Sequence, residues 1–265
     1  MTAPEPAARR PAAPVRVARE GLTLAWRSIL KIRHSPDQLL DLSLMPITFV
    51  VLFTFLFGNA VSGDWHAYLQ FVLPGVAVQA LVFASMNTAI GFNSDLRSGV
   101  FDRLRSLPIS RAAPLIGRVL GDVVRNVVSL AMVFAVGAVL GFRAHAGLLA
   151  ILAACGLILA FSLSMCWMAA LAGLLARSPE SMGGFVFITV VPLTFGSNVF
   201  VPTEKLPGWL QAWVKINPVS RLSEAARALM TRMPVGGSVR DSLLWTAAIL
   251  AVFAPLAIMV YRRKA

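Results

Sequence analysis

Long runs of apolar residues, separated by short polar segments, fill most of the chain after residue 38. Six runs stand out, at residues 39–58, 70–91, 119–141, 147–176, 183–200 and 243–261. A helix of about 20 predominantly apolar residues crosses the hydrocarbon core of a bilayer. The pattern therefore predicts an all-α integral membrane fold with six transmembrane helices. The fourth run is longer than a bilayer requires, which indicates a tilted helix or one that projects into the cytoplasm.

The residues before the first run form two segments of different character. Residues 1–17 are rich in Pro, Ala and Arg, a composition that predicts a disordered cytoplasmic N-terminus. Residues 18–34 place apolar side chains on one helical face and basic ones, including Arg27 and Lys31, elsewhere around the helix. This pattern favours a helix that lies in the membrane interface over a simple helical spacer. Residues 18–265 are accordingly treated as one six-span domain.

The distribution of Lys and Arg predicts the orientation of the spans. The segment between the second and third runs is rich in Arg, whereas residues 59–69 contain neither Lys nor Arg. Because basic loops are retained in the cytoplasm, we expect both termini on that side. Residues 201–242 conflict with this orientation, since they are assigned to the outside yet contain six Lys and Arg residues. A re-entrant fifth segment is the alternative to six full crossings.

The conflicting segment carries two amphipathic stretches. One surrounds Trp209 and Trp213, and the other follows Asn217-Pro218. Asn as the cap and Pro in the first turn are typical of a helix start. We therefore expect two short helices between the fifth and sixth spans, folded back towards the bundle.

Composition and motifs exclude most catalytic functions. Hydrophobic residues make up 57% of the chain and charged residues only 14%, against about a quarter charged in soluble domains. No GxxxxGK[ST] phosphate-binding motif is present. His34, His66 and His145 all lie outside the apolar runs, so no histidine is placed to activate a nucleophile within the membrane. We therefore expect no enzymatic activity and no cofactor bound by this chain.

Charge and possible metal ligands do not alter this picture. The net charge of +12 comes largely from basic residues that flank the apolar runs, which indicates membrane topology and not nucleic-acid binding. Asp64, His66 and His145 are interpreted as ordinary loop residues in preference to a metal site. Cys155 and Cys166 fall within one run, about 16 Å apart along a helix. That distance is too long for a disulfide, so both are interpreted as packing residues.

A charged stripe marks the start of the third span. Its members recur at helical spacing on one face: Arg111, Arg118, Asp122 and Arg125. One interpretation is that the arginines reach lipid phosphates with Asp122 as their local partner. The other is a structural or conformational latch at a protein interface.

The segment between the second and third spans has the pattern of an amphipathic helix. Asn93 or Ser94 is expected to cap it, and Pro108 to end it. A polar surface is left on this helix, formed by Asp95, Arg97, Asp102, Arg103 and Arg105. A helix that rests on lipid headgroups would also need such a face, but we favour docking of a protein partner.

Two stretches, together with the helix before the first span, resemble the ATP-binding-cassette type 2 permeases, in particular the daunorubicin-resistance type of drug-export permease. The stretches are SGVFDRLRSLPISRAAPLIGRVLGD and FVPTEKLPGWLQAWVKINPVSRLSEAARAL. The resemblance covers almost the whole chain. It implies a homodimer, or a pair of similar subunits, in a bacterial plasma membrane, with multidrug efflux and antibiotic resistance as the associated function.

The resemblance also implies partner subunits. Two copies of a separate cytoplasmic ATPase would bind ATP and Mg, and the helix between spans two and three would couple them to the permease. By position, Asp95 to Arg105 would take that role, with Arg27 and Lys31 nearby. The family implies export of a drug, natural product or lipid-like amphipathic compound, while its substrate-contacting residues do not transfer.

Two rival functions remain open, namely a proton-coupled secondary transporter and a membrane-embedded enzyme.

Small-residue patterns at Gly137-x-x-x-Gly141 and Ala169-x-x-x-Gly173 allow close helix packing. Such patterns are common, so they do not locate a dimer seam.

Overall fold

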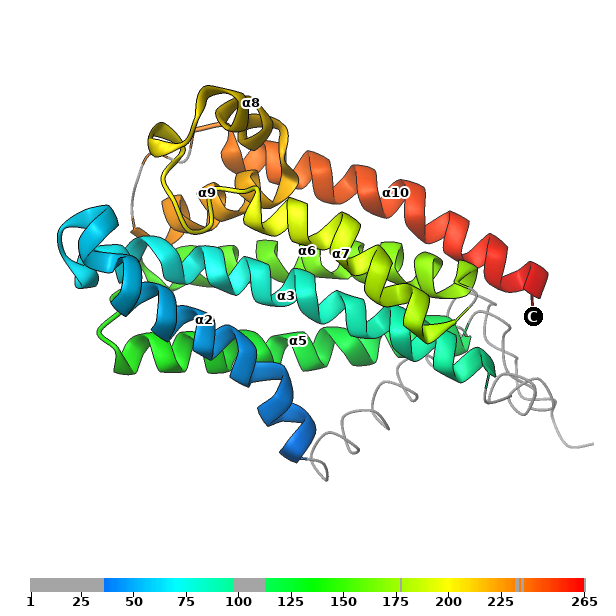
Figure 1. Ribbon diagram of the computed structural model, residues 1–265. Coiled ribbons are helices and arrows are strands. Elements are labelled where there is room, and N and C mark those ends of the chain that lie inside the picture. The colour runs from blue at the N-terminus through cyan, green and yellow to red at the C-terminus, as the bar shows by residue number, and fades with distance from the viewer. Residues whose placement is uncertain (1–35, 98–112, 177, 232–233, 235, 265) are drawn as a thin grey trace, which may run out of the picture.

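The computed structural model describes residues 36–97, 113–176, 178–231, 234 and 236–264. Within these ranges every regular element is helical (Figure 1). The elements are α2 (Pro36–Ser62), α3 (Trp65–Arg97), α5 (Ala113–Val139), α6 (Leu148–Leu175), α7 (Pro179–Phe195), the 3₁₀ turn η1 (Thr203–Lys205), α8 (Gly208–Ile216), α9 (Pro218–Thr231) and α10 (Ser238–Lys264). The predicted N-terminal tail, the interfacial helix at 18–34 and residues 98–112 lie outside the described residues.

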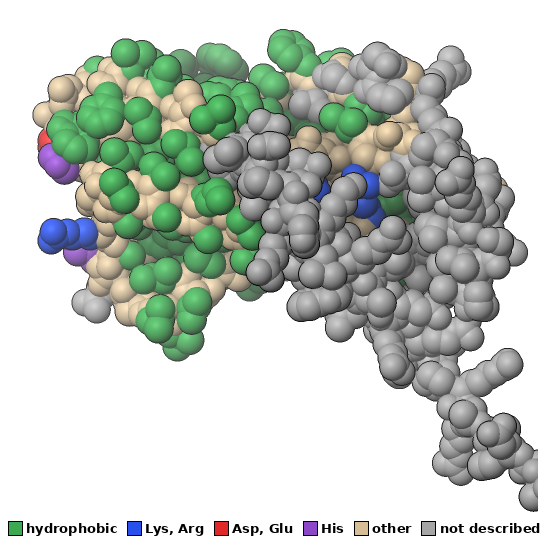
Figure 2. Space-filling view, turned by 90° about the horizontal axis from the view of Figure 1, so that it is seen from below, with side chains coloured by type: hydrophobic (Ala, Val, Ile, Leu, Met, Phe, Trp, Pro, Cys, Tyr) green, Lys and Arg blue, Asp and Glu red, His purple; other side chains and the backbone are tan. Residues whose placement is uncertain are grey.

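Five of the described helices, α2, α3, α5, α6 and α10, are long and apolar enough to cross a membrane. They confirm five of the six predicted runs. The predicted fifth span corresponds to α7, which has 17 residues and is therefore about 25 Å long, short of the roughly 30 Å hydrocarbon core. On the described surface that Figure 2 shows, hydrophobic side chains are widespread and charged ones are few, as expected where lipid is the solvent.

The centre of the bundle is α3, which packs against α2, α5, α6, α7 and α9. Its apolar side chains are buried on all sides, among them Leu69, Leu73 and Leu81. The two small-residue patterns serve this packing. A Cβ at Gly173 would lie 2.3 Å from the carbonyl oxygen of Ala89 on α3, and one at Gly137 would meet the side chain of Leu73. Both patterns are therefore used within the subunit.

Three connections gather at one end of the bundle, which we call the α8–α9 end. The Nζ of Lys205 donates to the carbonyl of Val61, at the end of α2. The backbone N–H of Ala146, before α6, donates to the carbonyl of Met230 in α9 at 3.2 Å. The turn between α2 and α3 lies at this same end in Figure 1. α7 and the segment after it therefore lead from the opposite end of the bundle to the α8–α9 end.

Two predicted boundaries are wrong. α7 ends at Phe195, not at residue 200, and Gly196 is its C-cap, where a Cβ would lie 2.4 Å from the carbonyl oxygen of Pro192. Residues 197–200 are buried as a non-helical segment at the α8–α9 end. Val199 and Phe200 extend the apolar run beyond the helix, whereas Gly196, Ser197 and Asn198 before them are turn-forming residues that mark the helix end.

The second wrong boundary is the helix start expected at Asn93 or Ser94. α3 continues through both residues to Arg97. The buried Asn93 amide instead donates to the carbonyls of Gly173 and Ala176, at 3.1 and 2.9 Å. The last carbonyls of a helix have no partner within it, so Asn93 satisfies the end of α6.

The two short helices expected between the fifth and sixth runs are present as α8 and α9. The predicted cap is confirmed, since Oδ1 of Asn217 accepts from the backbone N–H of Val219 at 2.9 Å. The Asn217 amide also donates to the carbonyl of Leu193 at 2.8 Å. One side chain therefore starts α9 and closes the end of α7.

Candidate functional site

A charged cluster, formed by Arg118, Asp122 and Arg125 on α5 with Thr88 on α3, lies towards the end of the bundle opposite α8 and α9. The buried carboxylate of Asp122 accepts from Nη1 of Arg125 at 3.1 Å and lies 3.7 Å from Nε of Arg118. The Thr88 hydroxyl donates at 2.7 Å to Oδ2 of Asp122, the oxygen that lies nearer Arg118. Three of the four residues of the predicted stripe are therefore joined within the subunit, while Arg111 lies outside the described residues.

The neighbouring surface of α3 is shaped to receive Arg118. A Cβ at Gly91 would lie 1.7 Å from Nη2 of Arg118, so a side chain there would displace the guanidinium from this position. The Arg118 Cζ lies 5.9 Å from the centre of the Phe92 ring, within the range of a cation–π contact. The Arg118 and Arg125 side chains stay 29% and 25% exposed, so each can also contact water or a lipid headgroup.

A polar ladder continues from the charged cluster into the bundle. The Asn126 amide on α5 donates to the Ser162 hydroxyl on α6 at 2.6 Å. The Cys166 sulfur lies 3.6 Å from the Thr88 hydroxyl. Hydrogen bonds between spans stabilise membrane bundles by about 0.6 to 2 kcal/mol each. Sequence analysis missed Thr88, Asn126 and Ser162; the signal that could have found Asn126 is its position one turn after Asp122.

At the other end of the bundle a second arginine, Arg227 of α9, is fully enclosed. Its Nε donates to the Phe71 carbonyl at 2.8 Å, and its Nη2 donates to the carbonyls of Asn198 and Val199 at 2.6 and 3.0 Å. All three acceptors are backbone oxygens. We call Phe71, Gly75, Asn198 and Val199, the residues that hold this guanidinium, the Arg227 seat.

The α3 part of the seat depends on two features of its sequence. The carbonyl of Phe71 accepts from Nε of Arg227, and the Phe71 ring lies 3.8 Å from the Arg227 Cζ. A Cβ at Gly75 would lie 2.9 Å from Nη2 of Arg227 and 3.0 Å from the carbonyl oxygen of Val199. A side chain at position 75 would therefore displace the guanidinium or the Val199 backbone.

Burial lowers the pKa of Arg227 to about 10, against the opposing effects of Glu224 and Tyr68. The side chain is thus still positively charged at neutral pH. A buried charge is tolerated where hydrogen bonds compensate its lost hydration, and the three carbonyls accept from three of the five N–H donors of this side chain.

The basic residues that conflict with the predicted topology are partly held by the fold. Arg221 binds Glu224 at 3.1 Å and lies 3.7 Å from Asp241 of α10. Arg227 is bound in its seat, and Lys205 binds a carbonyl. Three of the basic residues between 201 and 242 therefore have structural partners at the α8–α9 end.

Most of the predicted ATPase-coupling residues cannot be placed. Asp95 and Arg97 are at the C-terminal end of α3, which is the end opposite α8 and α9, and their side chains lie outside the described part. The others, Arg27, Lys31, Asp102, Arg103 and Arg105, fall in ranges that the structure does not describe.

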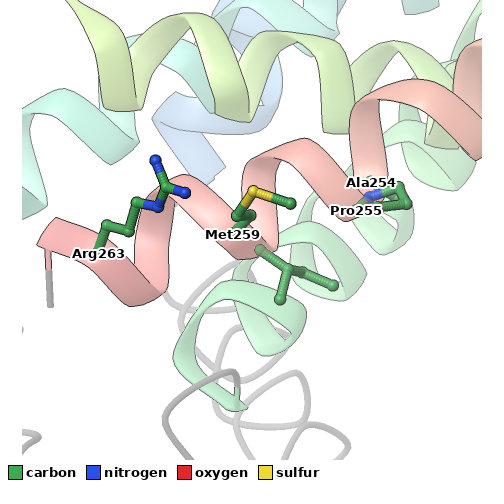
Figure 3. A pocket seen from close by; sticks show the side chains of 5 residues that line it. Ala254, Pro255, Met259 and Arg263 are labelled. Atoms are coloured by element: carbon green, nitrogen blue, oxygen red, sulfur yellow. The ribbon is translucent and has the colours of Figure 1, made fainter.

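No metal or catalytic centre is found among the described residues. They contain no group of three His, Cys, Asp or Glu side chains that could hold an ion. A hollow of about 560 Å³ lies beside α10, lined by Ala254, Pro255, Ile258, Met259 and Arg263; Figure 3 shows these side chains. These side chains offer apolar contact and one cation, but no nucleophile and no general acid.

Comparison with known proteins extends this description. Residues 19–231 match the model of the ABC-2 type transporter family. The chain is 44% identical over 243 residues to the daunorubicin resistance ABC transporter permease protein DrrB1 of Streptomyces coeruleorubidus, covering 92% of this chain and 86% of that protein.

More distant relatives align over similar lengths. The chain is 31% identical to the probable doxorubicin resistance ABC transporter permease protein DrrC of Mycobacterium tuberculosis, over 83% of this chain and 79% of that protein. It is 26% identical to the putative transport permease ycf38 of Cyanophora paradoxa, over 79% and 73%. With a family match across most of its length, an all-helical fold and five membrane-spanning candidates, this chain belongs to the ABC-2 type transporter family.

Proposed function

We propose that this chain is the membrane-spanning subunit of an ATP-driven exporter that moves an amphipathic drug, natural product or lipid-like compound out across a bacterial plasma membrane. The observation that carries this proposal is the 44% identity, over 92% of the chain, to a permease named for daunorubicin resistance. Identity at that level across nearly the whole length supports a shared transport role.

The proposed topology has six crossings with both termini in the cytoplasm. It is supported by the path of α7, which with residues 196–200 leads from one end of the bundle to the other. The α8–α9 end would then face outwards, and α8 and α9 would form the re-entrant pair. The end of α3 that carries Asp95 and Arg97 would face the cytoplasm.

The proposed partners are two copies of a cytoplasmic ATPase that bind ATP and Mg, and a second copy of this permease. The absence of a phosphate-binding motif from the sequence makes a separate ATPase necessary for an ATP-driven cycle. ATP binding would draw the ATPase subunits together, and the segment after α3 would pass that motion to the spans.

Charge reversal in the coupling segment tests this proposal. In the variant Asp102→Lys with Arg105→Glu, we expect loss of co-purification with the ATPase and loss of ATP-dependent efflux, with membrane insertion unchanged. Glu204→Lys, a charge reversal in η1 at the other end of the bundle, is the matched control and should keep both activities. Unchanged efflux and co-purification in the double variant would refute the coupling role.

The structure gives little support to the rival transport mechanism. A proton-coupled transporter needs a carboxylate that can take up and release a proton within the membrane. The buried carboxylate in α5, Asp122, is instead engaged by Arg118, Arg125 and Thr88. That arrangement fits a structural ion-pair cluster.

A further inference from the structure

We propose that Arg227 makes α9 a two-state latch. In one state the guanidinium is inserted in its seat and α9 lies against α3, as observed. In the other, α9 has lifted from α3 and the guanidinium is in water. A role of this latch in the transport cycle rests on the proposed function, whereas the existence of the latch does not depend on it.

The seat favours two discrete positions because its bonds depend on one another. One guanidinium binds the Phe71 carbonyl of α3 and two carbonyls of the segment after α7, at 2.6 to 3.0 Å. A small outward shift would break these bonds while the charge was still shielded from water, and a buried unpaired charge is strongly disfavoured. Arg227 is therefore stable either fully inserted or fully hydrated.

The contact between α9 and the bundle is also suited to opening. The buried residues of α9 are mainly small or polar: Ser220, Ser223, Ala225, Ala226, Arg227 and Ala228 accompany Val219, Leu222 and Met230. Small side chains bury little apolar area, so separating them from the bundle exposes little apolar surface. Val219, Leu222 and Met230 are the larger apolar side chains that opening would have to withdraw from the core around α3 and α6.

Two polar atoms in this contact have no hydrogen-bond partner among the described residues. They are the Ser223 hydroxyl oxygen and Oδ1 of Asn198, both buried. Native proteins leave few buried polar atoms unsatisfied, and each such atom costs free energy. Both atoms would be hydrated once α9 lifted. The seated state is thus held by Arg227 and by the Asn198 amide, which donates to Glu224 of α9 at 2.7 Å, and it is opposed by the two unsatisfied atoms.

Thiol accessibility at position 223 tests the latch. The reporter is the full-length chain with Cys155→Ala and Ser223→Cys, with the native buried Cys166 retained as an internal reference, purified in detergent and treated with a water-soluble maleimide. Arg227→Lys keeps the charge but cannot bridge three carbonyls, and Gly75→Ala obstructs the seat from α3 while Arg227 is intact. We expect labelling of position 223 to be about tenfold faster in each, since at least one charge-assisted hydrogen bond is lost.

Two controls separate opening from general loosening. Gly91→Ala displaces Arg118 in the same manner at the other end of α3 and should leave the rate at position 223 unchanged. Cys166 should remain unlabelled in every variant. The latch is refuted if neither variant of the seat accelerates labelling, if Gly91→Ala accelerates it equally, or if Cys166 is labelled together with position 223.

This assay requires neither ATPase nor substrate, so its result is independent of the proposed function. Faster labelling without ATP-dependent efflux would retain the latch and reject the exporter. Efflux with an unresponsive position 223 would retain the exporter and reject the latch.

Discussion

Arg227 and Arg118 are both received by a glycine of α3, one at each end of the bundle, but their partners differ. Arg118 lies beside Asp122 of its own helix, four residues away. The hydrogen-bond acceptors of Arg227 are backbone carbonyls, contributed by Phe71 of α3 and by Asn198 and Val199 after α7. The charged cluster is thus mostly local, whereas the Arg227 seat ties three distant parts of the chain together.

The charged cluster and the Arg227 seat are two different ways in which a membrane bundle can accommodate charge at its ends. In the charged cluster the buried carboxylate of Asp122 has two arginine partners, which stay 29% and 25% exposed. Loss of the carboxylate therefore leaves both arginines within reach of water or headgroups, and loss of one arginine leaves Asp122 the other. No residue of the Arg227 seat is itself charged. Loss of the Arg227 side chain would leave all three carbonyls without the donor that this side chain supplies. The seat should therefore be the more sensitive of the two to substitution.

The largest effect is expected from Arg227→Ala. It removes three hydrogen bonds to buried carbonyls and should lower the free energy of unfolding by about 3 kcal/mol or more. Chemical denaturation of the purified chain in detergent measures the change. A loss smaller than that of any substitution in the charged cluster would reverse the comparison.

Asp122→Asn should have a smaller effect, about 1 to 2 kcal/mol. The amide oxygen can still accept from Thr88, and the partly exposed arginines can find other partners. The same denaturation experiment provides the value. Destabilisation beyond that of Arg227→Ala would mean that the cluster, and not the seat, is the main polar anchor of the bundle.

Asn217→Ala should lower stability by about 1 kcal/mol, the usual cost of losing a helix cap. The effect should be concentrated at the α8–α9 end, because Asn217 caps α9 and binds the end of α7. Amide hydrogen exchange resolves this: protection should fall in α9 and remain unchanged in α5. Uniform loss of protection in both helices would argue against independent behaviour of the two ends.

The smallest effect concerns the start of α3. Backbone N–H groups of His66 and Ala67 donate to Asp64, and these bonds lower its pKa below the ordinary value of 3.8. A depressed pKa in the folded state stabilises above the unfolded pKa and loses that effect as pH falls through the folded value. The Asp64 cap should therefore persist at neutral pH and weaken only below about pH 4. Amide exchange at residues 66 and 67 should show this loss, and Asp64→Asn should abolish the pH dependence.

Much of the fold was accessible from the sequence because spans and caps are local features. Five apolar runs correspond to long helices, and the cap at Asn217 was identified from its dipeptide with Pro218. Arg118, Asp122 and Arg125 were grouped correctly because spacings of three and four residues share a helical face. Whether that group acts in transport stays a prediction.

The Arg227 seat was not accessible in the same way. Its acceptors are main-chain carbonyls at 71, 198 and 199, and carbonyls carry no signature in a sequence. Arg227 accordingly counted only as one of the basic residues that conflicted with the topology. The end of α7 was misplaced because Val199 and Phe200 continue the apolar run beyond it, although Gly196, Ser197 and Asn198 signal a turn.

The central claim, that this chain is the permease of an ATP-driven exporter, is tested most directly by transport in inside-out membrane vesicles that contain the chain and its partner ATPase. Daunorubicin fluorescence can report uptake. The proposal predicts accumulation that requires ATP and Mg, persists when a protonophore collapses the proton gradient, and disappears when the ATPase is omitted. Accumulation that proceeds without ATP and is abolished by the protonophore would contradict it.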